Sequence, residues 1–231
     1  MSPELIQKGA RLRSLIEQHR NAFASVARPP LNAENTILLN LSEPDNIVAN
    51  CDPTDADRCW SVIDSALKQQ DKIAAIGGYA EKRTAYRVNR TLFGDGKDER
   101  CIHLGVDIWI SSGTTIYAPL DGTVHSLADN AGVGNYGPTI ILEHELEGNH
   151  FYSLYGHLSR SSIKALTVGQ FVKQGEAFAT IGSAQENGNW PPHLHYQFIA
   201  DMMGCCGDFI GVSTEAEAEF YLALCPEPVV L

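Results

Sequence analysis

The sequence contains no apolar run long enough to cross a lipid bilayer, and nothing at its amino terminus reads as a secretory leader. Charged side chains at Lys8, Arg11, Arg13 and Glu17 interrupt the apolar residues there, so no continuous apolar segment forms. We therefore expect a cytoplasmic protein. A chain trimmed of its leader, or exported by another route, would have the same sequence.

Basic side chains are also scarce. The 231 residues include 17 Lys and Arg against 28 Asp and Glu, which gives a net charge of −11, and no run of basic residues occurs. Because an acidic protein repels nucleic acids and anionic membranes, neither is expected as a partner. The hydrophobic content of 44% is typical of an ordinary globular protein with a substantial core.

The six cysteines have no Cys-x-x-Cys pair among them. The neighbouring residues Cys205 and Cys206 would form a disulfide only with strain. Without a leader to indicate export, we expect all six to be reduced thiols, and we do not expect a cysteine metal site.

Residues 1–95 mix helical and extended patterns and form an N-terminal α/β extension for which the sequence indicates no role. Pro29-Pro30 ends a first region of helical period. Thr54 and Asp57 have the spacing of a capping box and predict the start of a second helix, which continues through Leu67. The first region is predicted to be a helix over 4–26. A strand over 36–41 and an extended segment over 73–88 are also predicted.

The pattern changes after residue 95, and we treat 96–231 as a second unit with a C-terminal packing segment. Short apolar runs alternate there with Gly, Pro, Asn and Asp, which is typical of an all-β sandwich or barrel. A helical period returns only over 214–224. The predicted strands are 103–110, 114–118, 121–127, 138–144, 150–158, 177–182 and 193–200.

Two histidine clusters lie within these predicted strands. His103 and Asp107 are four residues apart around Gly105, and His193 and His195 are two residues apart. Residues at even spacing on a strand share one face. Two imidazoles and one carboxylate are an accepted ligand set for a catalytic zinc ion, which keeps an open position for water. Gln197 shares the face of His195 and is a candidate outer hydrogen-bond partner.

A third cluster, Tyr155-Gly-His157-Leu158, closes the predicted strand 150–158. The alternation along that strand places Tyr155 and His157 on one face. His157 lies at the strand end, where functional residues are often found, and Tyr155 is a weaker candidate for an oxyanion donor. The other four histidines are interpreted as structural: His19, His125, His144 and His150.

As a set, these motifs resemble those of the lysostaphin-type zinc endopeptidases, metallopeptidase family 23. That family is marked by an early His-x-x-x-Asp, a Tyr-x-His-Leu segment and a late His-Leu-His. The resemblance covers roughly residues 100–200, and the stretches 118–124 and 168–176 also look like turns of its barrel. The corresponding motifs here are His103-Leu-Gly-Val-Asp107, Tyr155-Gly-His157-Leu158 and His193-Leu-His195.

The resemblance implies a compact antiparallel β barrel-like sandwich (the duplicated hybrid motif) that carries a metalloendopeptidase. It implies that His103, Asp107 and His195 bind Zn²⁺, and that His157 and His193 are the catalytic histidines. The substrate would be a peptide or a muropeptide of peptidoglycan. One departure is the stretch 182–192: where the family has a Gly-rich segment with Ser or Thr, this stretch ends in Trp190-Pro191-Pro192. The segments Tyr-Gly-His-Leu-Ser and Asn-Trp-Pro-Pro-His-Leu-His also resemble a subgroup found as modules within cytosolic multi-module proteins.

Two other functions share parts of this pattern. A non-catalytic binding or scaffold module could keep the fold and the metal, but such copies tend to lose some of the five residues. A phosphocarrier-like domain could use two nearby histidines on a similar β sandwich, but it has no need for Asp107. A zinc-dependent peptidase or amidohydrolase is the interpretation that uses the complete set.

Overall fold

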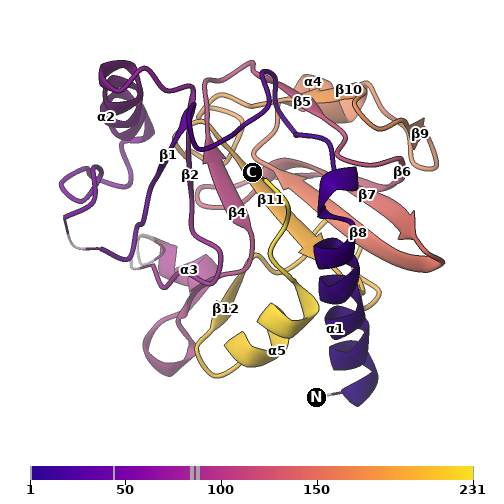
Figure 1. Ribbon diagram of the computed structural model, residues 1–231. Coiled ribbons are helices and arrows are strands. Elements are labelled where there is room, and N and C mark those ends of the chain that lie inside the picture. Colours follow the sequence, from indigo (N-terminus) through magenta and orange to yellow (C-terminus); the bar gives the residue numbers. More distant parts are fainter. Residues whose placement is uncertain (1, 44, 84–85, 87–88, 231) are drawn as a thin grey trace.

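The structure is a computed structural model that describes residues 2–43, 45–83, 86 and 89–230 (Figure 1). As predicted, the fold is mainly β with few helices. The largest element is an eight-stranded mixed sheet in which β1 and β2 run parallel and all other neighbours are antiparallel. Its strands, in spatial order, are β1 (Thr36–Leu38), β2 (Ala74–Gly77), β4 (Val106–Trp109), β11 (His193–Ile199), β8 (Asn149–Gly156), β7 (Gly137–Leu146), β6 (Gly122–Asn130) and β9 (Phe171–Val172).

Among the described residues, two small two-stranded sheets accompany the large one. One pairs β5 (Thr115–Tyr117) with β10 (Ala177–Thr180), and the other pairs β3 (Arg100–His103) with β12 (Val212–Thr214). The helices lie outside the sheets, as Figure 1 shows. They are α1 (Pro3–Gln18), α2 (Ala56–Gln69), α3 (Arg90–Phe93), α4 (Arg160–Lys164) and α5 (Ala218–Leu224), with 3₁₀ turns at Arg20–Ala22 and Gly96–Asp98.

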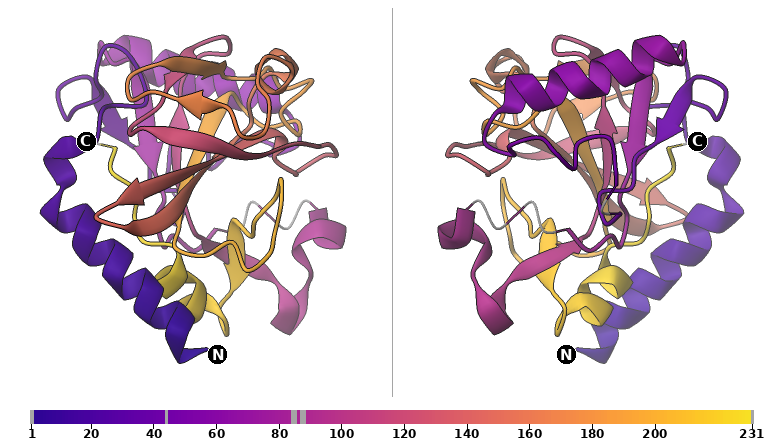
Figure 2. Two further views of the ribbon diagram at one scale, coloured as in Figure 1. Left: turned by 90° about the vertical axis from the view of Figure 1, so that its right-hand side faces the viewer. Right: turned by 90° about the vertical axis from the view of Figure 1, so that its left-hand side faces the viewer.

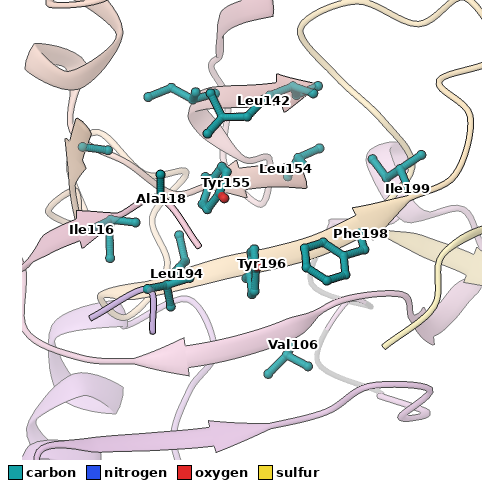
Figure 3. Close-up of a cluster of buried hydrophobic side chains, with 14 of the residues drawn as sticks. Val106, Ile116, Ala118, Leu142, Leu154, Tyr155, Leu194, Tyr196, Phe198 and Ile199 are labelled. Carbon is teal, nitrogen blue, oxygen red and sulfur yellow. The ribbon is translucent and has the colours of Figure 1, made fainter. Parts of the chain in front are cut away.

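Strand β11 lies in the middle of the large sheet and is buried along its whole length. Leu194, Tyr196 and Phe198 belong to the main hydrophobic core, which is drawn in Figure 3. The polar residues between them, His193, His195 and Gln197, are therefore carried on the opposite face. A buried strand with one apolar and one polar face places the polar side chains in an enclosed site rather than in water.

The predicted strand 103–110 is divided in two. β3 ends at His103 and pairs with β12, whereas β4 begins at Val106 and pairs with β2 and β11. The chain passes from one sheet to the other at Leu104-Gly105, where the Leu104 N–H donates to the carbonyl of Gly211 (2.9 Å). His103 and Asp107 thus do not lie on one strand, as the sequence pattern suggested.

Two predicted helix limits also differ. The first helix stops at Gln18 rather than continuing to residue 26, because the chain turns there and Phe23 then packs against Phe198 of the core. The capping residue of α2 is Asp55, whose side chain accepts from the Arg58 N–H (2.9 Å). Thr54 is not the cap; its hydroxyl donates to Asp52 (2.6 Å).

The other predicted elements are present with small shifts in their ends. The predicted helix 214–224 corresponds to α5, and the predicted strand 36–41 corresponds to β1. The first part of the predicted extended segment 73–88 forms β2. Positions 84–85 and 87–88 of that segment lie outside the described residues. The six cysteines all lie among the described residues, and none of them forms a disulfide. Within the described part of the chain, each helix is too short or too polar to cross a membrane.

Residues before position 95 join the large sheet directly. β2 pairs with β4, so Ala75 lies opposite Trp109 and Gly77 opposite Asp107. α2 packs on β2, and Ile63 and Leu67 of α2 form a second apolar cluster with Leu39, Ala75 and Trp109. The N-terminal segment therefore forms one edge of the sheet that carries the histidine clusters.

Helix α1 packs against α5 near the end of the chain, as both views of Figure 2 show. The contact is closest at Gly9, where an added Cβ would lie 1.9 Å from the carbonyl oxygen of Ala223. We expect Gly9→Ala to lower the free energy of unfolding by about 1–3 kcal/mol, because the methyl group forces the two helices apart. Helix propensity alone predicts the opposite sign, since Ala is favoured over Gly by about 1 kcal/mol.

Denaturant unfolding followed by circular dichroism measures this change. Gln7→Ala, an exposed position on the same helix, is the control and should leave stability within about 0.5 kcal/mol of the wild type. A Gly9→Ala protein as stable as the wild type would show that the α1–α5 contact is not tight.

Candidate active site

The histidine clusters meet because β4 and β8 flank β11. In this register His195 lies opposite Asp107 on one side and opposite Gly156 on the other. His103, the last residue of β3, reaches the same point from the small sheet. His103, Asp107 and His195 are all buried and together form a group able to hold a metal ion.

Three atoms of these residues converge. His103 Nε2 lies 2.9 Å from His195 Nδ1 and 3.4 Å from Asp107 Oδ1, and His195 Nδ1 lies 3.2 Å from Asp107 Oδ1. Zinc–nitrogen bonds of 2.0–2.1 Å in a tetrahedral site place neighbouring ligand atoms about 3.3 Å apart. The three donor atoms therefore fit one face of a zinc tetrahedron, and the donor types are those that zinc accepts.

Outer hydrogen bonds orient both ring ligands. His103 Nδ1–H donates to the Gly78 carbonyl (2.8 Å), which leaves Nε2 as a lone-pair donor. His195 Nε2–H donates to Gln197 Oε1 (2.9 Å), which leaves Nδ1 free. The Gln197 amide is itself fixed, because its NH₂ group donates to the Ile210 carbonyl (3.1 Å). Such partners hold metal-binding imidazoles in one tautomer and one orientation.

Gly105 allows the close approach of β4 to β11. An added Cβ would lie 2.8 Å from His195 Cε1 and 2.9 Å from its Nε2. The glycine between His103 and Asp107 therefore provides room for the imidazole of His195, and a larger residue would displace that ring.

His157 and His193 lie beside this group with their rings 4.2 Å apart, measured between centroids. His157 Nδ1–H donates to the Asn187 carbonyl (2.8 Å), and His193 Nδ1–H donates to the Pro191 carbonyl (2.7 Å). Each ring therefore has a free Nε2, and that of His193 lies 3.8 Å from Asp107 Oδ1. Burial lowers the pKa of both imidazoles, and that of His157 falls well below its ordinary value.

The backbone at His157 separates it from Tyr155. β8 ends at Gly156, and His157 has a φ of 61°, in the left-handed region. This turn brings the His157 ring to the site, whereas regular alternation would have left it on the face of Tyr155. Tyr155 is in the core (Figure 3), where its hydroxyl accepts from Ser153 (2.9 Å). The expectation that Tyr155 could donate to an oxyanion is therefore wrong.

A different tyrosine, Tyr136, lies at the site. Its ring contacts those of His157 and His195, with centroids 5.7 and 5.0 Å away, and its hydroxyl is 3.4 Å from His195 Nε2. Gly156 makes room for it, because a Cβ there would lie 2.7 Å from Tyr136 Cδ1. Sequence reasoning missed Tyr136, since a single tyrosine in the turn before β7 carries no spacing signal.

Arg83, from the N-terminal segment, is the other residue that the sequence did not indicate. Its guanidinium contacts Asp107 Oδ2 and Glu81 Oε2, and all three side chains are buried. Glu81 in turn accepts from the Leu41 N–H (2.6 Å). Burial by itself raises the pKa of the Asp107 carboxyl, but His103 and Arg83 outweigh it and hold that pKa well below its usual range. Asp107 is thus ionised, with Oδ2 held by Arg83 and Oδ1 directed at the histidines.

The site opens into a cleft of about 760 Å³ that both parts of the chain line. Trp109 stacks on His193 with a centroid distance of 5.9 Å, and Trp190 contacts His157 and His193 edge-on. The remaining four histidines lie outside the cleft lining. Of these, His144 is buried and its Nε2 contacts the Ser153 hydroxyl (2.6 Å).

The Arg83–Asp107 pair leads to a test of the site. In Arg83→Lys the charge remains, but one ammonium group cannot reproduce the planar fork that spans Glu81 and Asp107. We expect the dissociation constant for Zn²⁺ to rise by about 10–100-fold, the usual effect of removing a partner of a metal ligand. Competition against a chromophoric chelator measures this dissociation constant.

Arg160→Lys, at an exposed pair with Asp129, is the matched control and should bind zinc as the wild type does. Unchanged affinity in Arg83→Lys would contradict the assigned contact.

Part of the chain is similar to known peptidases. The sequence pattern of peptidase family M23 matches residues 101–203. An uncharacterized metalloprotease of Haemophilus influenzae is 43% identical over 97 residues, 42% of this chain and 18% of that protein. The peptidoglycan DD-endopeptidase ShyC of Vibrio cholerae is 34% identical over 99 residues, 43% of this chain and 20% of that protein. The catalytic domain of lysostaphin from Staphylococcus simulans is 25% identical, with a TM-score of 0.35, over 52% of this chain and 80% of that chain.

The chain spans about a fifth of the length of the two curated relatives, 18% and 20%. The five residues of the histidine clusters lie within the matched segment, whereas Glu81 and Arg83 precede it. Residues 101–203 of this chain are therefore similar to peptidase family M23.

Proposed function

We propose that this protein is a zinc-dependent metalloendopeptidase that hydrolyses a peptide or amide bond. The observation that carries the proposal is the convergence of three donor atoms, from His103, Asp107 and His195, beside two imidazoles with free Nε2 atoms. The similarity of residues 101–203 to peptidase family M23 supports the same reaction class.

His103, Asp107 and His195 would hold the ion through Nε2, Oδ1 and Nδ1. When bound, zinc supplies a water nucleophile at neutral pH and polarises the carbonyl group that is attacked. The Arg83 guanidinium keeps Asp107 ionised and holds its Oδ2. Gln197 and the Gly78 carbonyl keep the two ring ligands in the tautomers that binding requires.

His157 and His193 are proposed as the catalytic histidines. Because burial lowers both pKa values, the rings are neutral near pH 7 and each Nε2 can accept a proton. Their Nδ1–H groups are committed to backbone carbonyls, so neither ring can turn without losing a hydrogen bond. A ring that has taken a proton at Nε2 can donate it to the leaving amine or to a developing oxyanion.

Peptidoglycan peptides are the first substrate class to examine. A relative named as a peptidoglycan DD-endopeptidase matches this domain, although only over 20% of its own length. We propose cross-linked muropeptides and glycine-rich peptides as the starting panel, together with peptides whose side chains vary around the scissile bond.

The test separates metal binding from catalysis. Purified protein should contain about one zinc ion per chain, as a site with three protein ligands does. His195→Ala should lose the metal because it removes a ligand. His157→Ala and His193→Ala should keep it and lose hydrolysis of any peptide that the wild type cleaves. His150→Ala, at an exposed position away from the cleft, should change neither property.

Each other outcome points to a different function. Wild-type protein that is folded but contains no metal would contradict the proposal. Zinc-loaded protein that cleaves nothing in the panel would favour a binding or scaffold module. Phosphate transfer onto His157 or His193 without zinc would favour a phosphocarrier.

A further inference from the structure

One side of the cleft is built from apolar side chains that mostly come from outside residues 101–203. We call this surface the apolar wall. Four further residues of segment 39–63 line the cleft beside it: Asn46, Ala49, Cys51 and Cys59. The members of the apolar wall are Leu39, Leu41, Val48, Pro53, Ile63 and Trp109.

The apolar wall is held in place by the sheet and by α2. The Leu39 N–H donates to the Ile76 carbonyl (2.8 Å), and the Leu41 N–H donates to Glu81. Leu39 and Ile63 are buried in one cluster with Trp109, and Leu41 and Val48 pack against that cluster. Because these contacts tie the segment to β4, the surface is a fixed part of the site.

The apolar wall begins at the catalytic histidines. Trp109 is the cross-strand partner of His193, and their rings are stacked. A substrate whose reacting bond lies at His157 and His193 would therefore place a neighbouring group beside Trp109.

The charged side chains that line the cleft come from outside segment 39–63. Among the described residues that line the cleft, the acidic and basic side chains are Arg83, Arg100, Asp107 and Asp208, and none belongs to segment 39–63. Of these, Arg83 lies over Trp109, 5.7 Å from its ring centroid, and its guanidinium is already bound by Asp107 and Glu81. A charged substrate group at the apolar wall would lose water without finding a partner, whereas an apolar group gains by leaving water.

We infer that the apolar wall is a specificity subsite for a large uncharged side chain, such as leucine or methionine, next to the scissile bond. This inference rests on the proposed peptidase function and narrows its substrates. Glycine at that position would leave the apolar wall exposed to water, so glycine-rich peptides are the poorer substrates. Pockets of this size and composition, apolar with a few polar groups at one side, are typical of ligand sites.

The experiment uses phosphinic pseudopeptides, which mimic the tetrahedral transition state of zinc peptidases and need no turnover. Three probes carry Gly on both sides of the phosphinate, Leu on the amino side only, or Leu on the carboxyl side only. Calorimetric titration into the zinc-loaded full chain should show one Leu probe binding at least about tenfold tighter than the Gly–Gly probe. If both Leu probes bind within about threefold of Gly–Gly, the inference is overturned.

Two variants locate the preference. Val48→Asp and Ala49→Asp place a carboxylate at the apolar wall, and Ala49 is exposed, so its replacement does not disturb the core. Each should reduce the Leu-over-Gly ratio to below about threefold while leaving Gly–Gly binding nearly unchanged. Val168→Asp, at a valine that is 67% exposed and outside the cleft, is the matched control and should keep the full ratio. A ratio retained in both wall variants would also overturn the inference.

Parallel cleavage assays separate this subsite from the proposed reaction. A Leu preference among the probes, without cleavage of any peptide, would support the subsite and oppose the peptidase function. Cleavage without a Leu preference, in probes and peptides alike, would support the peptidase function and oppose the subsite.

Discussion

The site depends on one buried carboxylate. Asp107 lies inside the sheet, 2% exposed, where an ionised group is costly unless charge and hydrogen bonds surround it. His103, His195 and His193 approach its Oδ1 and Arg83 holds its Oδ2. Each partner is anchored elsewhere by a contact of its own, so the position of Asp107 and the positions of four other side chains are fixed together.

This dependence makes the N-terminal segment part of the site. Arg83 precedes the segment that matches the peptidase family, and it is held by Glu81, which in turn binds the backbone of Leu41. The same stretch of chain supplies β2, which pairs with β4 opposite Asp107. Buried ionic contacts and a cleft surface thus come from residues that carry no motif, and the matched segment alone would leave Asp107 without the Arg83 guanidinium.

Much of the fold and of the histidine groups is readable from the sequence, because local rules govern them. The alternation in β11 reflects a strand with an apolar and a polar face, and it places His193 and His195 together wherever that strand lies. His157 shows where local rules end. Period-two alternation assigns it to the face of Tyr155, but a left-handed backbone at His157 turns it to the opposite side. The prediction of one strand through His103 and Asp107 was wrong for a similar reason. Its first part pairs with β12 in a small sheet, and its second part pairs with β11 in the large sheet.

By itself, the sequence determined which residue types and spacings are available: the three histidine motifs, the glycine that admits the His195 ring, and the strand periods that carry them. The tertiary structure decided which atoms meet. The His103 Nε2, Asp107 Oδ1 and His195 Nδ1 triangle, the Arg83 contact, the place of Tyr136 and the apolar wall all join residues far apart in the chain. Such contacts follow from strand register and packing, which no local pattern encodes.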